Sequence, residues 1–272
     1  MSKTIFITGA SRGFGKLWAG ALLQRGDKVV ATARNLSALD DLVAQYGDNI
    51  LPLQLDVNDR SAGFAAIAKA KEHFGSIDVL INNAGYGLFG TIEEATEKDA
   101  RDQMETNFFG LLWLSQAVLP IMRAQGHGHI IQLSSVLGLI SRPVLGLYAA
   151  SKFAVEGLSE SLAAEVKGFG IKVSLIEPAG FDTEWGGSSA TRTAAIAAYD
   201  EVKASYEAGI PPDFRGVAGG TIAALLKLID SENPPLRLLL GKYAHLLVKR
   251  EYENRNAVWD GWLETTLAAQ GK

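Results

Sequence analysis

The sequence contains no cysteine, which excludes disulfide bonds, cysteine-based zinc sites and thiol catalysis. It also lacks a basic excess, because 26 Lys and Arg stand against 30 Asp and Glu for a net charge of -4. Without such an excess, nothing favours nucleic acid as a partner. Long apolar runs are missing too: Ser115, Gln116 and Pro120 interrupt the longest one, and the N-terminus is too polar for a signal peptide. We therefore expect a soluble cytoplasmic protein without a membrane partner.

Short apolar runs alternate with longer amphipathic segments along the chain. The runs predict strands at Thr4–Thr8, Lys28–Ala33, Ile50–Leu55, Val79–Asn82, His129–Leu133, Lys172–Ile176 and Leu236–Leu240. The segments between them predict helices at Gly13–Arg25, Leu36–Tyr46, Ser61–Phe74, Glu97–Ala124, Tyr148–Phe169 and Gly216–Asp230. This alternation predicts an α/β fold of the Rossmann type, a doubly wound three-layer sandwich with a mainly parallel sheet.

The composition shows no domain boundary before Pro178, so we expect residues 1–272 to form a single dinucleotide-binding catalytic domain. Residues 180–215 mix glycine, serine and proline with a helix-forming stretch, Ala194–Ala208, and are interpreted as a substrate lid. The extension at residues 242–272 is predicted to form a helix that covers the sheet edge.

A glycine-rich turn follows the first predicted strand and opens the first predicted helix. It contains Gly9, Ser11, Arg12, Gly13, Phe14 and Gly15. Gly9 permits the tight exit from the strand, Gly13 lets the backbone approach a pyrophosphate, and Gly15 lets the helix pack close to the strand. Because a helix N-terminus attracts anions, this turn predicts a dinucleotide site.

The end of the second predicted strand discriminates between the nicotinamide cofactors. A carboxylate there binds a ribose 2′-hydroxyl, whereas a basic residue accommodates a 2′-phosphate. Ala33 stands where the acid would be, Arg34 follows it, and Arg12 is a second nearby cation. The sequence therefore favours NADP(H) over NAD(H).

Two further motifs, Asn82-Asn83-Ala84-Gly85 and Tyr148-Ala149-Ala150-Ser151-Lys152, join the TGxxxGxG spacing of the glycine turn. In these motifs the chain resembles the short-chain dehydrogenase/reductase family from Thr4 to about Thr183. The resemblance implies a seven-stranded parallel sheet and nicotinamide-dependent oxidation or reduction.

The resemblance also implies roles for individual residues. Asp56, followed by Val57, resembles the acid that contacts the adenine amino group. Asn83, Ala84 and Gly85 resemble the turn beside the adenine ribose, and Asn107 resembles the asparagine that helps to hold a water in a proton relay. Ser135 matches the catalytic serine, Lys152 the residue that binds the nicotinamide ribose, and Pro178 to Thr183 the loop that holds the nicotinamide amide. Ala179 replaces that loop's usual glycine and Gly180 is displaced by one position, so the loop can bend differently.

Tyr148 and Lys152 are four residues apart on a predicted helix and share one face. The ordinary pKa of a tyrosine, about 10, is too high for an efficient acid or base at neutral pH, and a nearby ammonium lowers it. We therefore predict that Tyr148 transfers the proton, while Ser135 donates a hydrogen bond to the same substrate oxygen.

The residues expected near this centre are mostly apolar. The predicted substrate pocket contains Phe89, Leu137, Leu145, Phe181 and Trp185, which predicts a hydrophobic ketone, aldehyde or secondary alcohol as substrate. Trp113, Leu114 and Phe153 lie on long helices whose apolar faces need covering, and the resemblance implies a homodimer or homotetramer.

Two other functions remain open. An epimerase or dehydratase of the same family usually shows a GxxGxxG turn, which Gly9, Gly13 and Gly15 do not match. A dinucleotide-binding regulator without significant turnover would not need Tyr148. His127 and His129 flank Gly128 at the entry to the fifth predicted strand and lack nearby carboxylates, so no metal site is predicted there. Glu93-Glu94 is interpreted as a helix cap or a solvated pair.

Overall fold

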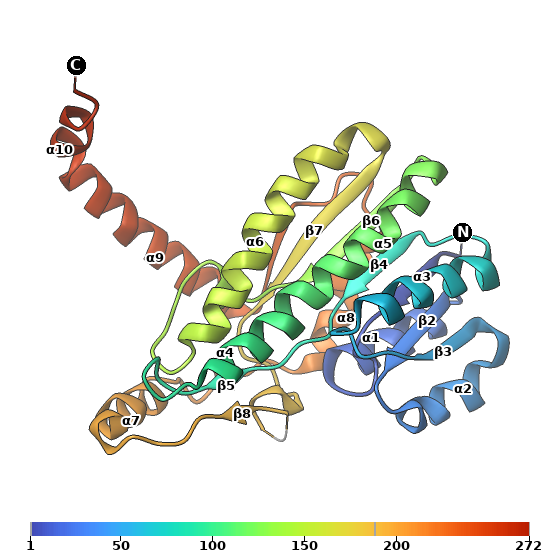
Figure 1. Cartoon of the computed structure of the whole chain (residues 1–272), viewed down its shortest axis with the longest axis horizontal. Coiled ribbons are helices and arrows are strands. Elements are labelled where there is room, and N and C mark those ends of the chain that lie inside the picture. Colours follow the sequence, from blue (N-terminus) through green and yellow to red (C-terminus); the bar gives the residue numbers. More distant parts are fainter. Residues whose placement is uncertain (1, 188, 272) are drawn as a thin grey trace.

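The computed structural model describes residues 2–187 and 189–271 and confirms the predicted α/β fold (Figure 1). A seven-stranded sheet has the order β3-β2-β1-β4-β6-β7-β9, and every pair in it is parallel. Its strands are β1 (Thr4–Ile7), β2 (Lys28–Ala33), β3 (Ile50–Gln54), β4 (Val79–Asn82), β6 (Gly128–Leu133), β7 (Ile171–Pro178) and β9 (Arg237–Leu240). Each predicted strand is present, with ends within two residues of the expected ones.

Helices cover both faces of the sheet. One face is covered by α1 (Gly13–Gln24), α2 (Asp40–Tyr46) and α8 (Thr221–Asp230), and the other by α3 (Arg60–Phe74), α5 (Gly110–Gln125) and α6 (Gly146–Val166). Alternate residues of each central strand supply the two cores. In β1, for example, Ile5 and Ile7 pack on the first face and Phe6 on the second. A strand buried on both faces must be apolar at nearly every position, which is why the runs were visible in the sequence.

The helix predicted over Glu97–Ala124 is helical without a gap, but it is not α-helical throughout. It consists of α4 (Glu97–Met104), a π-helical turn at Glu105–Phe109 and α5. The turn contains Asn107, whose side chain is buried and bonded to other segments. π-Helical turns often occur at functional sites, and the hydrophobic periodicity of the sequence does not reveal them.

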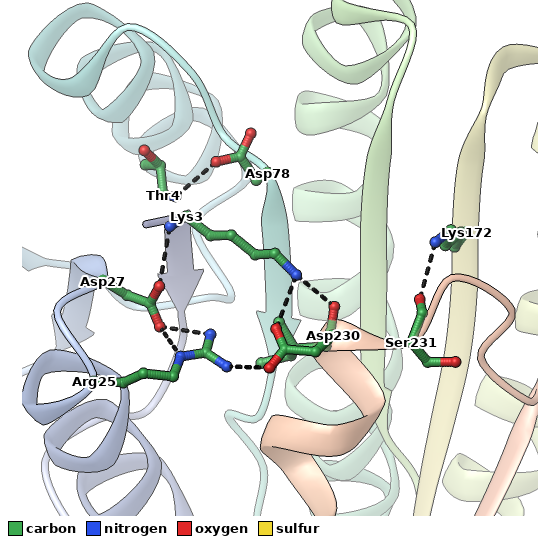
Figure 2. A network of polar contacts seen from close by, with 9 residues as sticks. Lys3, Thr4, Arg25, Asp27, Asp78, Lys172, Asp230 and Ser231 are labelled. Atoms are coloured by element: carbon green, nitrogen blue, oxygen red, sulfur yellow. Dashed lines mark hydrogen bonds and ion pairs between the residues drawn. The ribbon is translucent and has the colours of Figure 1, made fainter. Parts of the chain in front are cut away.

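Charged side chains join the amino ends of the strands to the ends of two helices (Figure 2). Buried Asp27 accepts hydrogen bonds from the Lys3 backbone N–H at 3.0 Å and from Arg25 Nε at 2.7 Å. Exposed Asp230 binds Lys3 Nζ at 3.1 Å and Arg25 Nη1 at 2.9 Å. Asp78 accepts a bond from the Thr4 N–H at 2.7 Å. This network fixes the start of β1 at the end opposite the glycine turn.

Replacing Asp27 with alanine should lower the free energy of unfolding by about 2–3 kcal/mol, because it leaves the Lys3 N–H and Arg25 without their buried acceptor. Asp230→Ala is the matched control, since its more exposed ion pairs should contribute less than about 1 kcal/mol. Urea denaturation followed by circular dichroism measures both. Equal losses in the two variants would contradict this ranking.

The predicted lid contains a strand and a helix that begins later than expected. The strand β8 (Thr191–Arg192) pairs with β5 (Leu88–Phe89), and α7 spans Asp200–Ala208 rather than Ala194–Ala208. The preceding residues are held away from a helix, because the Thr193 N–H donates to the Phe89 carbonyl and the Ile196 N–H donates to Glu94. Ser188 of the predicted lid lies outside the described residues.

The extension is helical, but the prediction that it covers the sheet edge was wrong. The helices α9 (Lys242–Gly261) and α10 (Leu263–Ala268) lead away from the sheet (Figure 1). α9 starts directly after β9 through Gly241, which has a φ of 97°, so no reversal returns the chain along the edge. Its first turns pack beside the lid through Ala244, whereas Trp259 is exposed.

The apolar face expected on α5 and α6 is partly covered within the chain. Leu114 is buried and packs against Gly63 of α3, so it is not available to a second copy. Trp113 stacks on Phe109 and lies beside Arg60. Phe153 on α6 is exposed. The predicted pairing of two copies stays a prediction that concerns Phe153 more than Leu114.

Candidate active site

A cleft of about 1710 Å³ lies at the carboxyl ends of the parallel strands, where ligands of open α/β sheets bind. The segments that follow the strands line one side of it, and the lid lines the other. All predicted catalytic residues except Asn107 are among the lining residues, as are all predicted cofactor and pocket residues except Gly15, which lies behind the turn.

The glycine turn has the geometry of a close backbone approach. Gly9 and Gly13 have positive φ values of 66° and 54°. A Cβ atom on Gly15 would lie 2.2 Å from the Gly9 carbonyl oxygen and 2.5 Å from Asn83 Nδ2, so only glycine fits there. The first N–H groups of α1 have no side-chain cap, because Arg12 at the N-cap position makes no such bond. These free donors fit the pyrophosphate of a dinucleotide.

The two predicted phosphate-binding arginines are exposed at the cleft. Arg12 and Arg34 both line it and, among the described residues, neither side chain makes an ion pair. Ala33 is buried at the end of β2, where no carboxylate faces the cleft. Exposed Asp56 and buried Val57 follow β3 at the adjacent wall. The side chain of Phe14 stacks on Trp18, so Phe14 offers the cleft its backbone rather than a free ring.

The turn after β4 is bonded to the end of β1. Thr8 Oγ1 accepts hydrogen bonds from the N–H groups of Asn83 and Ala84, both at 2.9 Å, and Asn83 Nδ2 donates to the Thr8 carbonyl at 2.8 Å. A Cβ atom on Gly85 would lie 3.0 Å from Asn107 Oδ1 and 3.8 Å from Lys152 Nζ. Because Gly85 has no side chain, space remains between this turn and the side chains of Asn107 and Lys152.

The structure brings the predicted catalytic residues into one buried group. Tyr148 and Lys152 lie one turn apart on α6, with Lys152 Nζ 5.7 Å from the centre of the Tyr148 ring. Lys152 Nζ donates to the Leu133 carbonyl at 2.7 Å. Ser135 Oγ accepts from the Leu137 N–H at 3.1 Å. Asn107 Nδ2 donates to the Tyr86 carbonyl at 3.0 Å and to Ser151 Oγ at 3.1 Å, which fixes it beneath the site.

Burial shapes the acidity of this group. Burial raises the pKa of Tyr148, and the Ser135 hydroxyl lowers it in part. Burial lowers the pKa of Lys152 to about 8, although the negative charge of Glu156 acts in the opposite direction and raises this pKa. The expected lowering of the Tyr148 pKa by the Lys152 ammonium is not found, because burial is the dominant effect and the opposing effect comes from the Ser135 hydroxyl. Tyr148 is therefore a protonated phenol, the form that gives a proton to a carbonyl oxygen.

Aromatic and aliphatic side chains surround Tyr148. The Trp185 ring lies edge-on to Tyr148, with centroids 4.9 Å apart, and contacts Phe89 at 5.4 Å. Leu137 and Leu145 belong to the same apolar cluster. Phe181 also lines the cleft, but its ring packs against Phe14, at a centroid distance of 5.4 Å, and against the core around α1 rather than in the cluster around Tyr148. Glycines at positions 216 and 241 leave room for this ring.

A strained backbone position borders the same pocket. Val144 has a φ of 70°, which a β-branched residue rarely adopts. Its carbonyl accepts a hydrogen bond from the Gly90 N–H at 2.8 Å, so the strand that carries Phe89 holds it in place. Such strain is typical of segments that shape a functional site.

The loop after β7 reaches from the catalytic centre to the glycine turn. The Pro178 carbonyl accepts from Ser135 Oγ at 3.5 Å, and the Thr183 side chain lies 3.8 Å from the Cβ position of Gly13. Gly180 packs tightly against Phe214, where a Cβ atom would come within 2.4 Å of the ring. The displaced glycine thus serves the packing of the lid, and Thr183 still lies at the dinucleotide side.

Several residues of this site were missed in the sequence. Glu94, expected to be a cap or solvated, is buried and accepts bonds from Lys203, the Ile196 N–H and the Thr91 N–H, which ties the lid to β5. The Lys203 ammonium holds the pKa of Glu94 down at about 2. Tyr206 of α7 and Leu247 of α9 also line the cleft. Only the position of the lid could reveal these residues, because no local motif marks them.

Comparisons with known proteins point to one family. Residues 3–193 match the profile of the family described as short chain dehydrogenase. The oxidoreductase BOA17 of Botryotinia fuckeliana is 39% identical over 280 residues, which cover 99% of this chain and 100% of that protein. The 3-ketodihydrosphingosine reductase of Bacteroides thetaiotaomicron is 37% identical over 253 residues, covering 89% of each chain.

Solved structures are similar along nearly their whole length. A short-chain dehydrogenase from Streptomyces avermitilis is 37% identical, with a TM-score of 0.92 over 98% of both chains. A Burkholderia cenocepacia enzyme in complex with NADP is 26% identical, with a TM-score of 0.76 over 96% of this chain and 98% of that one. A Burkholderia phymatum enzyme in complex with NAD is 25% identical, with a TM-score of 0.82 over 94% of this chain and 95% of that one.

No helix of the described residues is long and apolar enough to cross a membrane. From its fold, its motifs and these similarities, the chain belongs to the short-chain dehydrogenase/reductase family of oxidoreductases.

Proposed function

We propose that this oxidoreductase uses NADPH to reduce a hydrophobic ketone or aldehyde, or runs the reverse reaction on a secondary alcohol. The observation that carries the proposal is the placement of Tyr148, a buried phenol on the floor of an apolar pocket beside Ser135. A hydroxyl donor in such a pocket suits a neutral carbonyl better than a charged substrate.

The chain's own residues account for the movement of the proton. A bound NADPH would supply the hydride. Tyr148 gives its proton to the carbonyl oxygen, and the Ser135 hydroxyl donates a hydrogen bond to that oxygen as its negative charge grows. Lys152 holds a positive charge one helical turn away, which stabilises the phenolate left on Tyr148. In the reverse direction Tyr148 accepts the proton from the alcohol.

The exposed arginines support the choice of NADPH. Arg34 follows β2 directly after buried Ala33, and Arg12 of the glycine turn lines the same cleft, so two cations are available to a 2′-phosphate and β2 ends without a carboxylate. A 2′-phosphate pairs well with arginine forks. The similar Burkholderia cenocepacia structure holds NADP, and the Burkholderia phymatum structure holds NAD. The two exposed arginines of this chain favour NADP over NAD.

The lining of the pocket supports an apolar substrate. Phe89, Leu137, Leu145 and Trp185 pack in one apolar cluster with Tyr148, and Tyr206 of the lid and Leu247 of α9 also line the pocket. The relative from Bacteroides thetaiotaomicron is named as a reductase of a keto compound, which agrees with this direction of reaction.

NADPH oxidation against a panel of aryl, alicyclic and long-chain ketones tests the proposal, with NADH in parallel. We expect turnover to be higher with NADPH. Arg34→Ala should raise the KM for NADPH about tenfold and change the KM for NADH less than about twofold, because one charge-assisted hydrogen bond to the 2′-phosphate is lost. Arg250→Ala, an exposed arginine on α9, is the control.

Two results would contradict the proposal. Tight NADPH binding with no turnover of any carbonyl compound would favour a dinucleotide-binding regulator. An equal loss of NADPH and NADH affinity in Arg34→Ala would remove this arginine from cofactor selection.

A further inference from the structure

Two glutamates are buried close to Lys152 in the chain or in the sheet, one on the helix that carries Tyr148 and Lys152 and one on a neighbouring strand. Glu156 on α6 and Glu177 on β7 are 4% and 0% exposed. Neither residue reaches the cleft. A buried carboxylate is costly unless it is paired and hydrogen-bonded, so the surroundings of these two side chains determine their charge.

Glu156 has the bonding of an ionised carboxylate. Its Oε1 accepts a hydrogen bond from Ser134 Oγ at 2.5 Å, and its Oε2 accepts one from Arg237 Nε at 2.9 Å. The same arginine also binds exposed Glu160 through Nη2 at 2.6 Å.

Glu177 has the opposite surroundings. Neither of its oxygens accepts a hydrogen bond from the described residues, and Arg237 Nε lies 3.6 Å from Oε1. Burial, and then the charge of Glu156, raise the pKa of Glu177 to about 8. One arginine shared among three carboxyl groups cannot neutralise them all. A proton on Glu177 removes one buried charge and lets Glu177 donate a hydrogen bond to Glu156, and this bond also raises the pKa of Glu177.

The pair is joined to the catalytic residues on three sides. Glu156 lies one helical turn after Lys152, Ser134 directly precedes Ser135, and Glu177 directly precedes Pro178, whose carbonyl accepts from Ser135 Oγ. The side chains of Ser134 and Glu156 are tightly packed, because a Cβ atom on Gly138 would lie 2.6 Å from Ser134 Oγ and 2.9 Å from Glu156 Cγ.

We propose that Glu156 and Glu177 share one proton, so that Glu156 provides a single fixed negative charge that keeps Lys152 protonated, and that Glu156 is a positioning residue for the proposed reaction. The inference rests on the proposed function only for the role of Lys152. The charged or titratable groups around Lys152 are Tyr148 and Glu156 on its own helix, Glu177 on β7 and Arg237 on β9, while β6 and the π-helical turn offer the Leu133 carbonyl and the neutral Asn107.

The pH dependence of ketone reduction tests the role of Glu156. Activity should fall on the alkaline side as Lys152 loses its proton. Glu156→Gln removes the charge that favours the ammonium, so the alkaline midpoint should move down by about 1 pH unit. Glu177→Gln mimics the protonated acid and should keep the midpoint of the wild type. Glu160→Gln, on the exposed side of α6, is the matched control. An unchanged midpoint in Glu156→Gln would overturn the proposed effect on Lys152.

A second measurement does not depend on turnover. Infrared difference spectra between the wild type and Glu177→Gln at neutral pH should show the carbonyl stretch of a protonated carboxyl group in the wild type alone. Its absence would show that both acids are ionised and would overturn the shared proton, even if Glu156→Gln does not fold. If no ketone is turned over, the pH dependence of NADPH binding reports on Lys152 instead. The reductase proposal and the proton-sharing pair therefore fail by different results.

Discussion

Replacing Tyr148 with phenylalanine should lower kcat for ketone reduction by roughly 10²–10⁴-fold, because the variant loses the buried phenol beside Ser135 that would give its proton to the carbonyl oxygen. The ring itself should stay in place, since it packs edge-on to Trp185 in a cluster that does not need the hydroxyl. Single-turnover oxidation of NADPH with saturating ketone measures the chemical step.

The same variant should bind NADPH within about threefold of the wild type, because the glycine turn and Arg34 are untouched. Fluorescence titration of NADPH checks this. Tyr252→Phe, on the exposed face of α9, controls for the loss of a tyrosine hydroxyl elsewhere. Reduction by Tyr148→Phe at the wild-type rate would show that another group supplies the proton.

Gly15→Ala should reduce kcat/KM by about 100-fold and lower the free energy of unfolding by about 1–3 kcal/mol. The added methyl group would meet the Gly9 carbonyl at 2.2 Å and Asn83 Nδ2 at 2.5 Å. Neither group can move freely, because Gly9 turns the chain out of β1 and Asn83 is bonded to the Thr8 carbonyl. Both the glycine turn and the turn after β4 would shift at the dinucleotide site.

Gly20, another glycine in α1, provides the control. A Cβ atom on Gly20 meets only Leu42 Cδ2, at an ordinary 3.7 Å, so Gly20→Ala should keep activity and gain up to about 1 kcal/mol of stability from helix propensity. NADPH titration and urea denaturation of both variants separate the local clash from a general effect of alanine in α1. Equal behaviour of the two variants would mean that the turn tolerates a side chain.

The glycine turn and the catalytic helix show what sequence reasoning reaches. Gly9, Gly13 and Gly15 could be identified because they lie at a fixed spacing within seven residues, where the positive φ values of Gly9 and Gly13 and the approach of Gly15 to the Gly9 carbonyl are local features. Tyr148 and Lys152 could be placed on one face because the helical period is fixed. The strands could be located because burial on both faces requires continuous apolar runs.

The lid shows where such reasoning stops. Glu94 and Lys203 are 109 positions apart, and the burial of Glu94 follows from how residues 191–203 fold over β5. Phe181 was predicted to line the substrate pocket. It does line the cleft, but its ring packs on Phe14, a contact between distant segments that the sequence does not reveal. The direction of α9 also depended on Gly241, whose φ of 97° no periodicity reports.

The parallel α/β fold, the glycine-rich turn and the family could be read from the amino-acid sequence, as could the positions predicted to be catalytic, because each depends on local periodicity or on a short motif. The acidity of Tyr148 and Lys152, the burial of Glu156 and Glu177, and the closing of the pocket by the lid became visible in the folded chain alone. Burial and the charges of neighbouring side chains are set by segments far apart in the chain, and these two effects decide which groups carry protons.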